Sequence, residues 1–417
     1  MNVVAPRESE VRSYSRIWPA MFDHARGSWL YTKPGDSYLD FFSGAGTLNY
    51  GHNEPRLKRA LIDYVERDGV THGLDMFTTA RADLMNTLST LVLEPRGLDY
   101  KIVFPGPAGA TAVEAALKLA RKASGRKVVG YFDMGFHGVT AGALSIAGNA
   151  SRRASAGIPL GFSVALPYDP DPDRLAAEVP DFDRLLDGTG QLADLAAVIV
   201  ETVQGEGGMN TARIAWLRAL AEACRRNGVL LIVDDIQMGC GRTGPFFSFE
   251  DAGLTPDMVC LSKGISGYGC PLALLLISPE LDVWRPGEHN GTFRGFNLAF
   301  VTGAEALRAY WSGDKLERST RARGDRVDQA LRNIAAEYPG AGLNVRGRGL
   351  ARGLAFADPA LAQQVQSAAF ERHLLMETSG ARNDVVKLLP PLTITDDELE
   401  EGLAITRGSI RAALGGE

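Results

Sequence analysis

The sequence lacks the cysteine and histidine patterns that bind metal ions. It has four cysteines, none of them in a CxxC pair, and its six histidines form neither an HExxH motif nor a close pair. We therefore expect no structural or catalytic metal. The cysteines lie in helix-like or strand-like contexts, which favours buried thiols over disulfide bonds. They are Cys224, Cys240, Cys260 and Cys270.

Long apolar runs and an excess of positive charge are also lacking. No apolar run approaches the length that spans a membrane, and the first residues, MNVVAPRESEVRSYSR, contain no apolar signal core. The net charge of −6 gives no reason to expect a nucleic acid or an anionic membrane as a partner. These features predict a cytoplasmic protein.

The composition that remains is that of an ordinary globular enzyme. Hydrophobic residues make up 45% and charged residues 23% of the 417 positions, and this length suits one large domain and a smaller one. From about residue 100 to residue 280, segments typical of strands and helices alternate. This alternation favours right-handed crossovers and a mostly parallel sheet. The predicted fold class is α/β.

The two ends of the chain have different patterns. Residues Gly27 to Gly46 show aromatic alternation around a Pro-Gly turn, which indicates a hairpin. Beyond residue 284 the sequence predicts a long helical segment through Ala304 to Tyr338, then strands in VRGRGLARGLAFA. In the last helix, Thr395 and Glu398 are spaced as a capping box. We expect a smaller α+β domain that the N-terminal segment completes.

Two short apolar segments end in groups that could carry chemistry. Val229 to Val233 is followed by Asp234 and Asp235, and Met258 to Leu261 is followed, after one serine, by Lys263. Such runs indicate buried strands of a parallel sheet, and ligands bind beyond the carboxyl ends of such strands. Pyridoxal phosphate needs a carboxylate for its ring nitrogen and a lysine for its aldehyde. Taken singly, either residue could be a surface charge at a strand end.

A Gly-rich turn provides a third possible element of a site. In FPGPAGATAVEAALKLARKASGR, residues 104–126, the turn directly precedes an Ala- and Leu-rich helix that ends at Gly125. Backbone amides at such a helix N-terminus bind anions such as phosphate. Because Gly-rich turns also precede helices in ordinary loops, this signal is not specific by itself.

Several motifs in a fixed order give the sequence a family resemblance. VDDIQMGCGRTG resembles the DE(V/I)Q-x-G-x-GRTG motif of class III, fold-type I, pyridoxal-phosphate aminotransferases. It is accompanied, in the family's order, by GHNEP, AVEAALKLAR, FHG, ETVQGEGG, SKGISGYG, GTFRGFN and LLPPLTIT. The resemblance covers about residues 20 to 410. Longer phrases, among them FFSGAGTLNYGHN, THGLDM and EHNGTFRG, are similar to the diaminobutyrate–2-oxoglutarate aminotransferases of ectoine biosynthesis.

The resemblance implies a domain organisation. Fold-type I aminotransferases have a large domain with a mostly parallel, seven-stranded sheet and a smaller α+β domain. Residues 61–300 are expected to form the large domain that binds pyridoxal phosphate, and residues 301–417 the C-terminal small domain. Residues 1–60 are expected to form an N-terminal segment that joins the small domain.

The resemblance also implies which residues hold the cofactor's ring. Lys263 would join its aldehyde and shuttle the proton during transfer, and Asp234 would pair with its ring nitrogen. Gln237 would hydrogen-bond the 3-hydroxyl oxygen. Ile236 would pack on one face of the ring, and Phe136 would stack on the other.

Further residues are implied at the phosphate and beside the ring. The amides of Gly109 and Ala110 would bind the phosphate. Thr292 would reach the phosphate of a neighbouring subunit, which implies a homodimer or higher homo-oligomer with a shared active site. Ala108 stands where many family members have Ser or Thr, so one phosphate hydroxyl is lost. His137, in FHG, would touch either the substrate or only the backbone.

The implied substrate residues are charged. Glu206 would act as a gate that pairs with a cation of the C-terminal domain until glutamate displaces it. The matching cation is Lys387 rather than Arg, and Lys offers a point charge in place of a bidentate fork. Glu201 would orient Gln237 or the substrate amine. Arg294 is a further candidate, because the TFRG segment should lie by the cofactor.

Other residues are weaker candidates for the substrate site. Arg242, in GRTG, is interpreted as a structural turn residue in preference to a substrate clamp. Aromatic side chains near the predicted hairpin could line the pocket, although such residues more often fill the core. They are Phe41, Phe42 and Tyr50.

The expected activity is transfer of an amino group from L-glutamate to L-aspartate 4-semialdehyde, which gives L-2,4-diaminobutyrate and 2-oxoglutarate. Alternatives within the family are ω-aminotransferases for ornithine, 4-aminobutyrate or an acetylated diamine, and an aminomutase on the same fold. A different class is a regulator that binds pyridoxal phosphate without catalysis. Such regulators usually carry a basic helix-turn-helix extension, which is not evident here, and Lys263 with Asp234 argues against a catalytically silent homologue.

Overall fold

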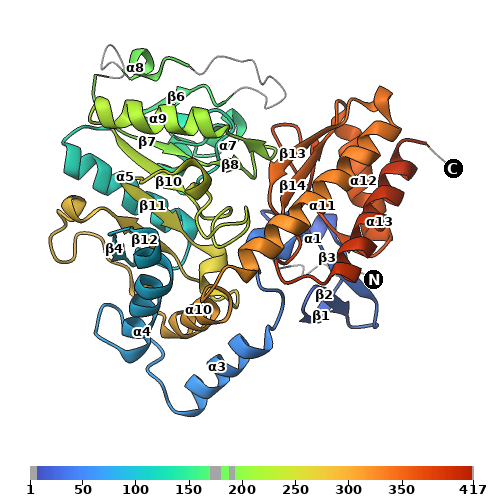
Figure 1. Ribbon diagram of the computed structural model, residues 1–417, viewed down its shortest axis with the longest axis horizontal. Coiled ribbons are helices and arrows are strands. Elements are labelled where there is room, and N and C mark those ends of the chain that lie inside the picture. The colour runs from blue at the N-terminus through green and yellow to red at the C-terminus, as the bar shows by residue number, and fades with distance from the viewer. Residues whose placement is uncertain (1–6, 170–179, 187–192, 416–417) are drawn as a thin grey trace.

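A seven-stranded sheet organises the larger part of the molecule (Figure 1). The computed structural model describes residues 7–169, 180–186 and 193–415. The strand order is β4-β12-β11-β10-β7-β5-β6, and β12 alone runs antiparallel to its neighbours. The predicted α/β class with a mostly parallel sheet is therefore confirmed. The strands are β4 (Lys101–Val103), β5 (Val128–Phe132), β6 (Ser163–Leu166), β7 (Leu195–Val200), β10 (Leu230–Asp234), β11 (Met258–Leu261) and β12 (Leu274–Ile277).

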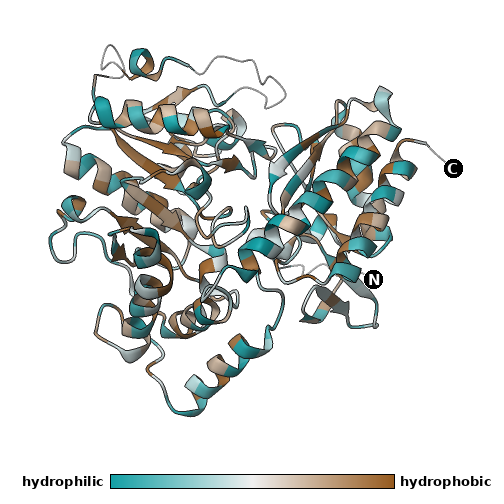
Figure 2. Ribbon diagram, in the orientation of Figure 1, coloured by the Kyte–Doolittle hydropathy of each residue, from teal (hydrophilic) through white to brown (hydrophobic). Residues whose placement is uncertain are grey.

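Helices cover both faces of this sheet. Side chains alternate along a strand, so Ile232 of β10 packs into the apolar cluster of α5 (Gly109–Ser124). Its neighbour Val233 packs on the other face, in the cluster that contains residues of α9 (Ile214–Arg226). In Figure 2 the strands are brown between helices whose outer faces are teal. Because both faces are buried, the sheet is held rigid and can position residues at its edge.

The helix α5 begins and ends where the sequence predicts. At its N-cap position stands Ala108, in an extended conformation and without a side chain that could accept hydrogen bonds from the first amides. At its C-terminus Gly125 adopts a left-handed conformation with φ of 71°, which costs glycine little. The helix therefore presents uncapped backbone amides at its start.

A second body combines the C-terminal residues with the N-terminal strands (Figure 1). Its antiparallel sheet has the order β13-β14-β17-β16, and a mixed sheet has the order β1-β2-β3-β15. The predicted hairpin is confirmed as β2 paired with β3, and the predicted capping box of Thr395 and Glu398 begins α13. The elements are β1 (Phe22–Arg26), β2 (Trp29–Thr32), β3 (Ser37–Asp40), β13 (Asn344–Arg348), β14 (Ala351–Ala355), β15 (Leu374–Leu375), β16 (Glu377–Ser379), β17 (Val385–Leu388), α12 (Pro359–Glu371) and α13 (Asp396–Ala413).

The helical segment predicted through Ala304 to Tyr338 is two helices, so that prediction is wrong in one respect. The first is α10 (Asn297–Tyr310), which packs on α3 (Pro55–Glu66) and α4 (Thr79–Leu88), and the second is α11 (Lys315–Glu337). The break includes Gly313, a poor helix former. It begins at Trp311, whose indole donates a hydrogen bond of 2.8 Å to the hydroxyl of Tyr50. Tertiary contacts thus end the helix where the chain passes between the two bodies.

Arg242 joins the two bodies from a buried position. Its Nη1 donates to the carbonyl oxygens of Leu350 and Pro390 at 3.1 and 2.5 Å, and its Nη2 donates to Oδ1 of Asn49 at 2.8 Å. Burial lowers the pKa of Arg242 to about 9. These contacts are with the protein itself, as expected of a structural residue.

The predicted preference for free thiols over disulfide bonds is confirmed. All four thiols are free; that of Cys270 is half-buried and the other three are buried. Across residues 7–169, 180–186 and 193–415, none of the helices has the length and apolar character needed to cross a membrane.

Candidate active site

Asp234 and Lys263 meet beyond the carboxyl ends of two adjacent parallel strands. Asp234 is the last residue of β10, and Lys263 follows β11, which pairs with β10 so that Asp234 lies opposite Cys260. Both side chains line a cavity of about 180 Å³. All the cofactor residues expected from the sequence line this cavity except Thr292. The rigid sheet therefore brings together an acid, an amine and a helix N-terminus.

The side chain of Lys263 is half-buried, and its amine is held by one carbonyl. Its Nζ donates to the carbonyl oxygen of Ala45 at 2.9 Å, and Nε2 of Gln237 donates to the same oxygen at 2.9 Å. Ala45 itself has a φ of 56°, a left-handed conformation that a non-glycine residue rarely adopts. Burial lowers the pKa of Lys263, which favours the neutral amine that attack on an aldehyde requires.

Asp234 is oriented by His137. The Nδ1 of His137 lies 2.7 Å from Oδ2 of Asp234, and the backbone amide of Ile236 donates to Oδ1 at 3.1 Å. Burial opposes protonation of His137, but the hydrogen bond and the charge of Asp234 outweigh it and raise its pKa. The sequence analysis considered contact of His137 with the substrate or with the backbone and did not indicate this contact with Asp234. The imidazole holds the carboxylate of Asp234 in place and also lines the cavity.

Glu201 also has a partner that the sequence did not indicate. Its Oε2 accepts a hydrogen bond of 2.9 Å from the backbone amide of Phe136, whereas Nε2 of Gln237 donates to the carbonyl oxygen of Ala45. Burial raises the pKa of Glu201. The carboxyl group thereby fixes the turn that carries Phe136 and His137.

The cavity fits pyridoxal phosphate at its phosphate end as well as at its ring. Ala108 leaves the first amides of α5 uncapped, and these belong to Gly109 and Ala110 at the cavity wall. A Cβ added at Gly109 would lie 3.1 Å from Ile236, and one at Gly138 would lie 2.8 Å from the Cβ of Ala110. A larger residue at either position would therefore displace Ile236 or Ala110 at the cavity wall. An anion at the helix N-terminus would meet free donors.

The predicted pair of Glu206 and Lys387 forms, and a third residue joins it. The Nζ of Lys387, which is fully buried, lies 2.7 Å from Oε1 of Glu206 and 2.8 Å from Oε1 of Glu377. Tyr14 donates a hydrogen bond to the other oxygen of Glu377 at 3.1 Å. Burial alone would lower the pKa of Lys387, but the two carboxylates raise it, so the amine stays charged.

Sequence reasoning did not find Glu377 or Arg152. Glu377 lies opposite Lys387 in the pairing of β16 with β17, a register that is not evident in the sequence. Arg152 belongs to α7 (Ala150–Ala154). Its guanidinium lies 4.3 Å from the centre of the Phe136 ring and 3.8 Å from Oε2 of Glu206.

The structure does not bring all candidates to the cavity of the same chain. Arg294 donates to the carbonyl oxygen of His289 at 3.4 Å, and its other contacts are likewise outside the cavity. Thr292, in η7 (Thr292–Gly295), is exposed. The aromatic candidates do not line the cavity, and two of them are core residues with exposures of 0% and 3%. The aromatic candidates are Phe41, Phe42 and Tyr50, of which Phe41 and Tyr50 are the core residues.

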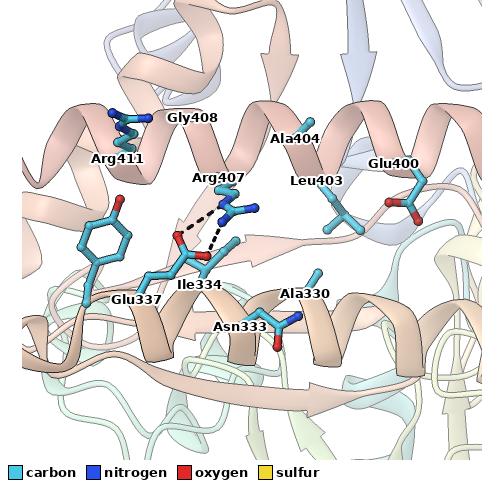
Figure 3. A pocket seen from close by; sticks show the side chains of 11 residues that line it. Ala330, Asn333, Ile334, Glu337, Glu400, Leu403, Ala404, Arg407, Gly408 and Arg411 are labelled. Carbon is cyan, nitrogen blue, oxygen red and sulfur yellow. Dashed lines mark hydrogen bonds and ion pairs between the residues drawn. The ribbon is translucent and has the colours of Figure 1, made fainter. Parts of the chain in front are cut away.

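A larger groove lies elsewhere, between α11 and α13 (Figure 3). It has a volume of about 750 Å³ and is bridged by an ion pair between Arg407 and Glu337. None of the candidate residues lines it. Volume alone therefore does not mark the site of chemistry.

Comparison with known proteins supports a single family. A family model described as Aminotransferase class-III matches residues 11–409. The chain is 59% identical, over 98% of its length and 94% of the relative, to a protein of Nocardia farcinica named diaminobutyrate–2-oxoglutarate transaminase.

Solved structures agree in fold. An ornithine aminotransferase from Toxoplasma gondii has a TM-score of 0.85 and 27% identity, and the match covers 98% of this chain and 93% of that one. An amine transaminase from an uncultivated Pseudomonas species, in its PLP-bound form, has a TM-score of 0.86 and 25% identity over 99% of both chains. The match of the family model to nearly the whole sequence, together with this agreement in fold, places the chain in the class III aminotransferase family.

Proposed function

We propose that the protein transfers an amino group from L-glutamate to C4 of L-aspartate 4-semialdehyde, which gives 2-oxoglutarate and L-2,4-diaminobutyrate. The observation that carries the aminotransferase chemistry is that Lys263 and Asp234 line one cavity next to an uncapped helix N-terminus. The choice of substrates is supported by the name of the relative that is 59% identical over nearly the full length. The transfer is expected to be ping-pong, with glutamate reacting first.

Pyridoxal phosphate is the cofactor of this reaction. When bound, it supplies an aldehyde that takes up the amino group and a ring that withdraws electrons from the substrate carbon. We propose that Lys263 joins the aldehyde, that Asp234 holds the proton at the ring nitrogen, and that Gln237 binds the 3-hydroxyl oxygen. Ile236 and Phe136 would contact the two faces of the ring. The amides of Gly109 and Ala110 would bind the phosphate.

Lys263 is also placed to move the proton. The Nζ of Lys263 would act as the base, because burial lowers the pKa of this amine. It would accept the proton from the substrate carbon and give it back during the transfer. Asp234, held in place by His137, would pair with the ring nitrogen.

Glu206 and Lys387 are proposed to distinguish the two substrates. Glutamate has a carboxylate on the carbon that reacts, and this group can take the place of Glu206 at Nζ of Lys387. Diaminobutyrate has no carboxylate on its reacting carbon, so Glu206 stays paired. Lys387 remains charged in both cases, because Glu377 is its second partner at 2.8 Å.

We propose that the protein is at least a homodimer. Segment 71–77 lies against segment 291–297, through hydrogen bonds of Gly73 with Gly295 and of Asn297 with Thr71. This surface exposes Met76, Phe77 and Phe293 to 60%, 104% and 62%. Exposed apolar side chains grouped in this way are typical of a protein interface. Thr292 lies in the same surface and would reach the phosphate bound by a partner subunit.

Two further proposals concern the chain as a whole. We propose that residues 1–60 complete the small domain of residues 301–417 and that residues 61–300 form the large domain. The pairing of β3 with β15 supports this division. The helices α3 and α10 pack on each other, and each of them crosses one of the proposed boundaries, at residues 60 and 300. A cytoplasmic location is supported by four free cysteines, which are typical of a reducing compartment.

The proposed function is tested by a direct assay of purified protein with pyridoxal phosphate, L-glutamate and L-aspartate 4-semialdehyde. We expect 2,4-diaminobutyrate as the product, detected by chromatography. Glutamate 5-semialdehyde and succinate semialdehyde serve as competing acceptors that represent ornithine and 4-aminobutyrate enzymes. A higher kcat/KM for either of them would assign the protein to another branch of the family.

A further inference from the structure

Arg152 is a cation beside the cavity that the proposed reaction has not used. Its guanidinium lies over the ring of Phe136 and 3.8 Å from Oε2 of Glu206, and both of these residues line the cavity. Its side chain is 39% exposed. A small molecule in the cavity can therefore reach Arg152 without a rearrangement of the core.

The hydrogen-bond donors of this guanidinium are available. The distance to Glu206 is longer than a hydrogen bond, and within the described part of the chain the Arg152 side chain donates to no other acceptor. The neighbouring Arg153 differs, because its Nη1 donates to the carbonyl oxygen of Ser145 and its guanidinium lies over Tyr131. The aromatic ring thus holds Arg152 in position and leaves its planar fork, which suits a carboxylate, free.

Glu206 lies between Arg152 and Lys387. Its Oε1 is 2.7 Å from Lys387, while its Oε2 is the oxygen nearest to Arg152. Burial raises the pKa of Glu206, but the charges of Lys387, Lys263 and Arg152 outweigh it and lower the pKa, so Glu206 remains a carboxylate. A carboxylate beside a free guanidinium is complementary to the ammonium and carboxylate groups of an amino acid.

The two proposed substrates have the same spacing between the reacting carbon and the distal carboxylate. In L-glutamate and in L-2,4-diaminobutyrate, the same number of carbon–carbon bonds separates the reacting carbon from the carboxylate at the far end. A cation at one fixed position can therefore bind the far carboxylate of both. The substrates differ at the reacting carbon, where only glutamate has a second carboxylate.

We propose that Arg152 binds the distal carboxylate of both substrates, and that Glu206 next to it binds the α-ammonium group of diaminobutyrate. The inference rests on the proposed function and deepens it by dividing recognition between two cations. Lys387 recognises the carboxylate on the reacting carbon and acts only on glutamate. Arg152 acts in both half-reactions and sets the length of substrate that the site accepts.

The test compares each substrate with an analogue that lacks only the distal carboxylate. L-2,4-diaminobutyrate is paired with 1,3-diaminopropane, and L-glutamate with L-2-aminobutyrate. Each amine is reacted singly with the holoenzyme, and the change in cofactor absorbance gives kcat/KM for that half-reaction. The variant is Arg152→Gln, and the matched control is Arg153→Gln, which removes the same charge from the same helix.

We expect Arg152→Gln to lower kcat/KM for both carboxylated substrates by about 10- to 100-fold, the value of a charge-assisted hydrogen bond. The two analogues should react at their wild-type rates. Arg153→Gln should keep the wild-type preference for each carboxylated substrate over its analogue. Arg152→Lys should recover part of the loss, because it restores a charge without the fork.

An equal loss for all four amines would overturn the proposal, because Arg152 would then only support Phe136. The proposal would also be overturned if Arg152→Gln kept the wild-type preference for carboxylated substrates over their analogues. The same holds if Arg153→Gln lost as much of this preference as Arg152→Gln. A wild-type enzyme that leaves diaminobutyrate unreacted would instead overturn the proposed function. In that case the comparison of L-glutamate with L-2-aminobutyrate would still decide whether Arg152 binds a distal carboxylate.

Discussion

His137 and Asp234 form a buried pair in which Nδ1 of the imidazole lies 2.7 Å from Oδ2 of the carboxylate. The side chains of both residues are almost fully buried, with exposures of 1% and 4%. The carboxylate that we assign to the cofactor's ring nitrogen is thus held by a second residue. Its orientation depends on the imidazole as much as on the end of β10.

Replacement of His137 tests this dependence. His137→Ala should weaken binding of pyridoxal phosphate by about 10-fold, because a hydrogen bond to a charged group is lost. His137→Asn should retain most of the affinity, since its amide nitrogen can take the position of Nδ1. Titration of apoprotein, followed by fluorescence, measures the affinity. Equal losses in the two variants would show that the hydrogen bond is unimportant.

Replacement of Lys263 tests its covalent role. Lys263→Ala should abolish turnover and remove the visible absorbance of the bound cofactor, because no amine remains to join its aldehyde. Lys58→Ala, at an exposed position of α3, is the control and should behave as the wild type. A variant at position 263 that keeps the wild-type spectrum would place the covalent bond at another lysine.

Replacement of Lys387 separates the two substrates. Lys387→Ala should raise the KM of L-glutamate about 10-fold or more, because the carboxylate on its reacting carbon loses a charged partner. The KM of L-2,4-diaminobutyrate should change much less. Removing the buried cation also leaves two carboxylates unpaired, which should lower the free energy of unfolding by about 3–5 kcal/mol.

Thermal denaturation of the same variant controls for that loss of stability, and Lys387→Arg, which keeps the charge, serves as the folded comparison. An equal increase in KM for glutamate and diaminobutyrate would contradict a role in reading the glutamate carboxylate.

Asp235 should make stability depend on pH. Burial raises its pKa to about 7, and one of its oxygens accepts a hydrogen bond of 3.0 Å from the amide of Ser248. A carboxyl group with a raised pKa stabilises the fold while it is protonated. This stability is present below the pKa of the unfolded chain and is lost as the pH rises through about 7.

Asp235→Asn should therefore gain stability relative to the wild type as the pH rises. We expect the difference in unfolding free energy to grow by about 2–3 kcal/mol between pH 5 and pH 8. Chemical denaturation at both pH values measures it, with exposed Asp99→Asn as the control. A difference that does not vary with pH would mean that Asp235 is ionised throughout.

Local patterns in the sequence were sufficient to predict the residues at the centre of the site. Asp234 ends one short apolar strand and Lys263 follows another, and adjacent parallel strands have their carboxyl ends at the same edge of the sheet. The start of α5 is also local, because a Gly-rich turn and an Ala-rich helix are contiguous. These features require no knowledge of how distant segments pack.

Features that depend on distant contacts were missed. Glu377 lies beside Lys387 because of the register in which β16 pairs with β17. Arg152 lies near Glu206 because of the position of a short helix that has no distinctive sequence. The break between α10 and α11 was missed because propensity over one segment does not include the contact of Trp311 with Tyr50. The partner of His137 required the fold, since 97 positions separate it from Asp234.

The buried guanidinium of Arg242 restricts how this enzyme can be recombined with its relatives. It satisfies two main-chain oxygens of the smaller body, at Leu350 and Pro390, and the amide side chain of Asn49. A chimera that exchanges residues 301–417 alone would keep Arg242 and replace the main chain that accepts its hydrogen bonds. Successful exchange therefore requires a relative whose main chain follows the same path at both of those carbonyl groups.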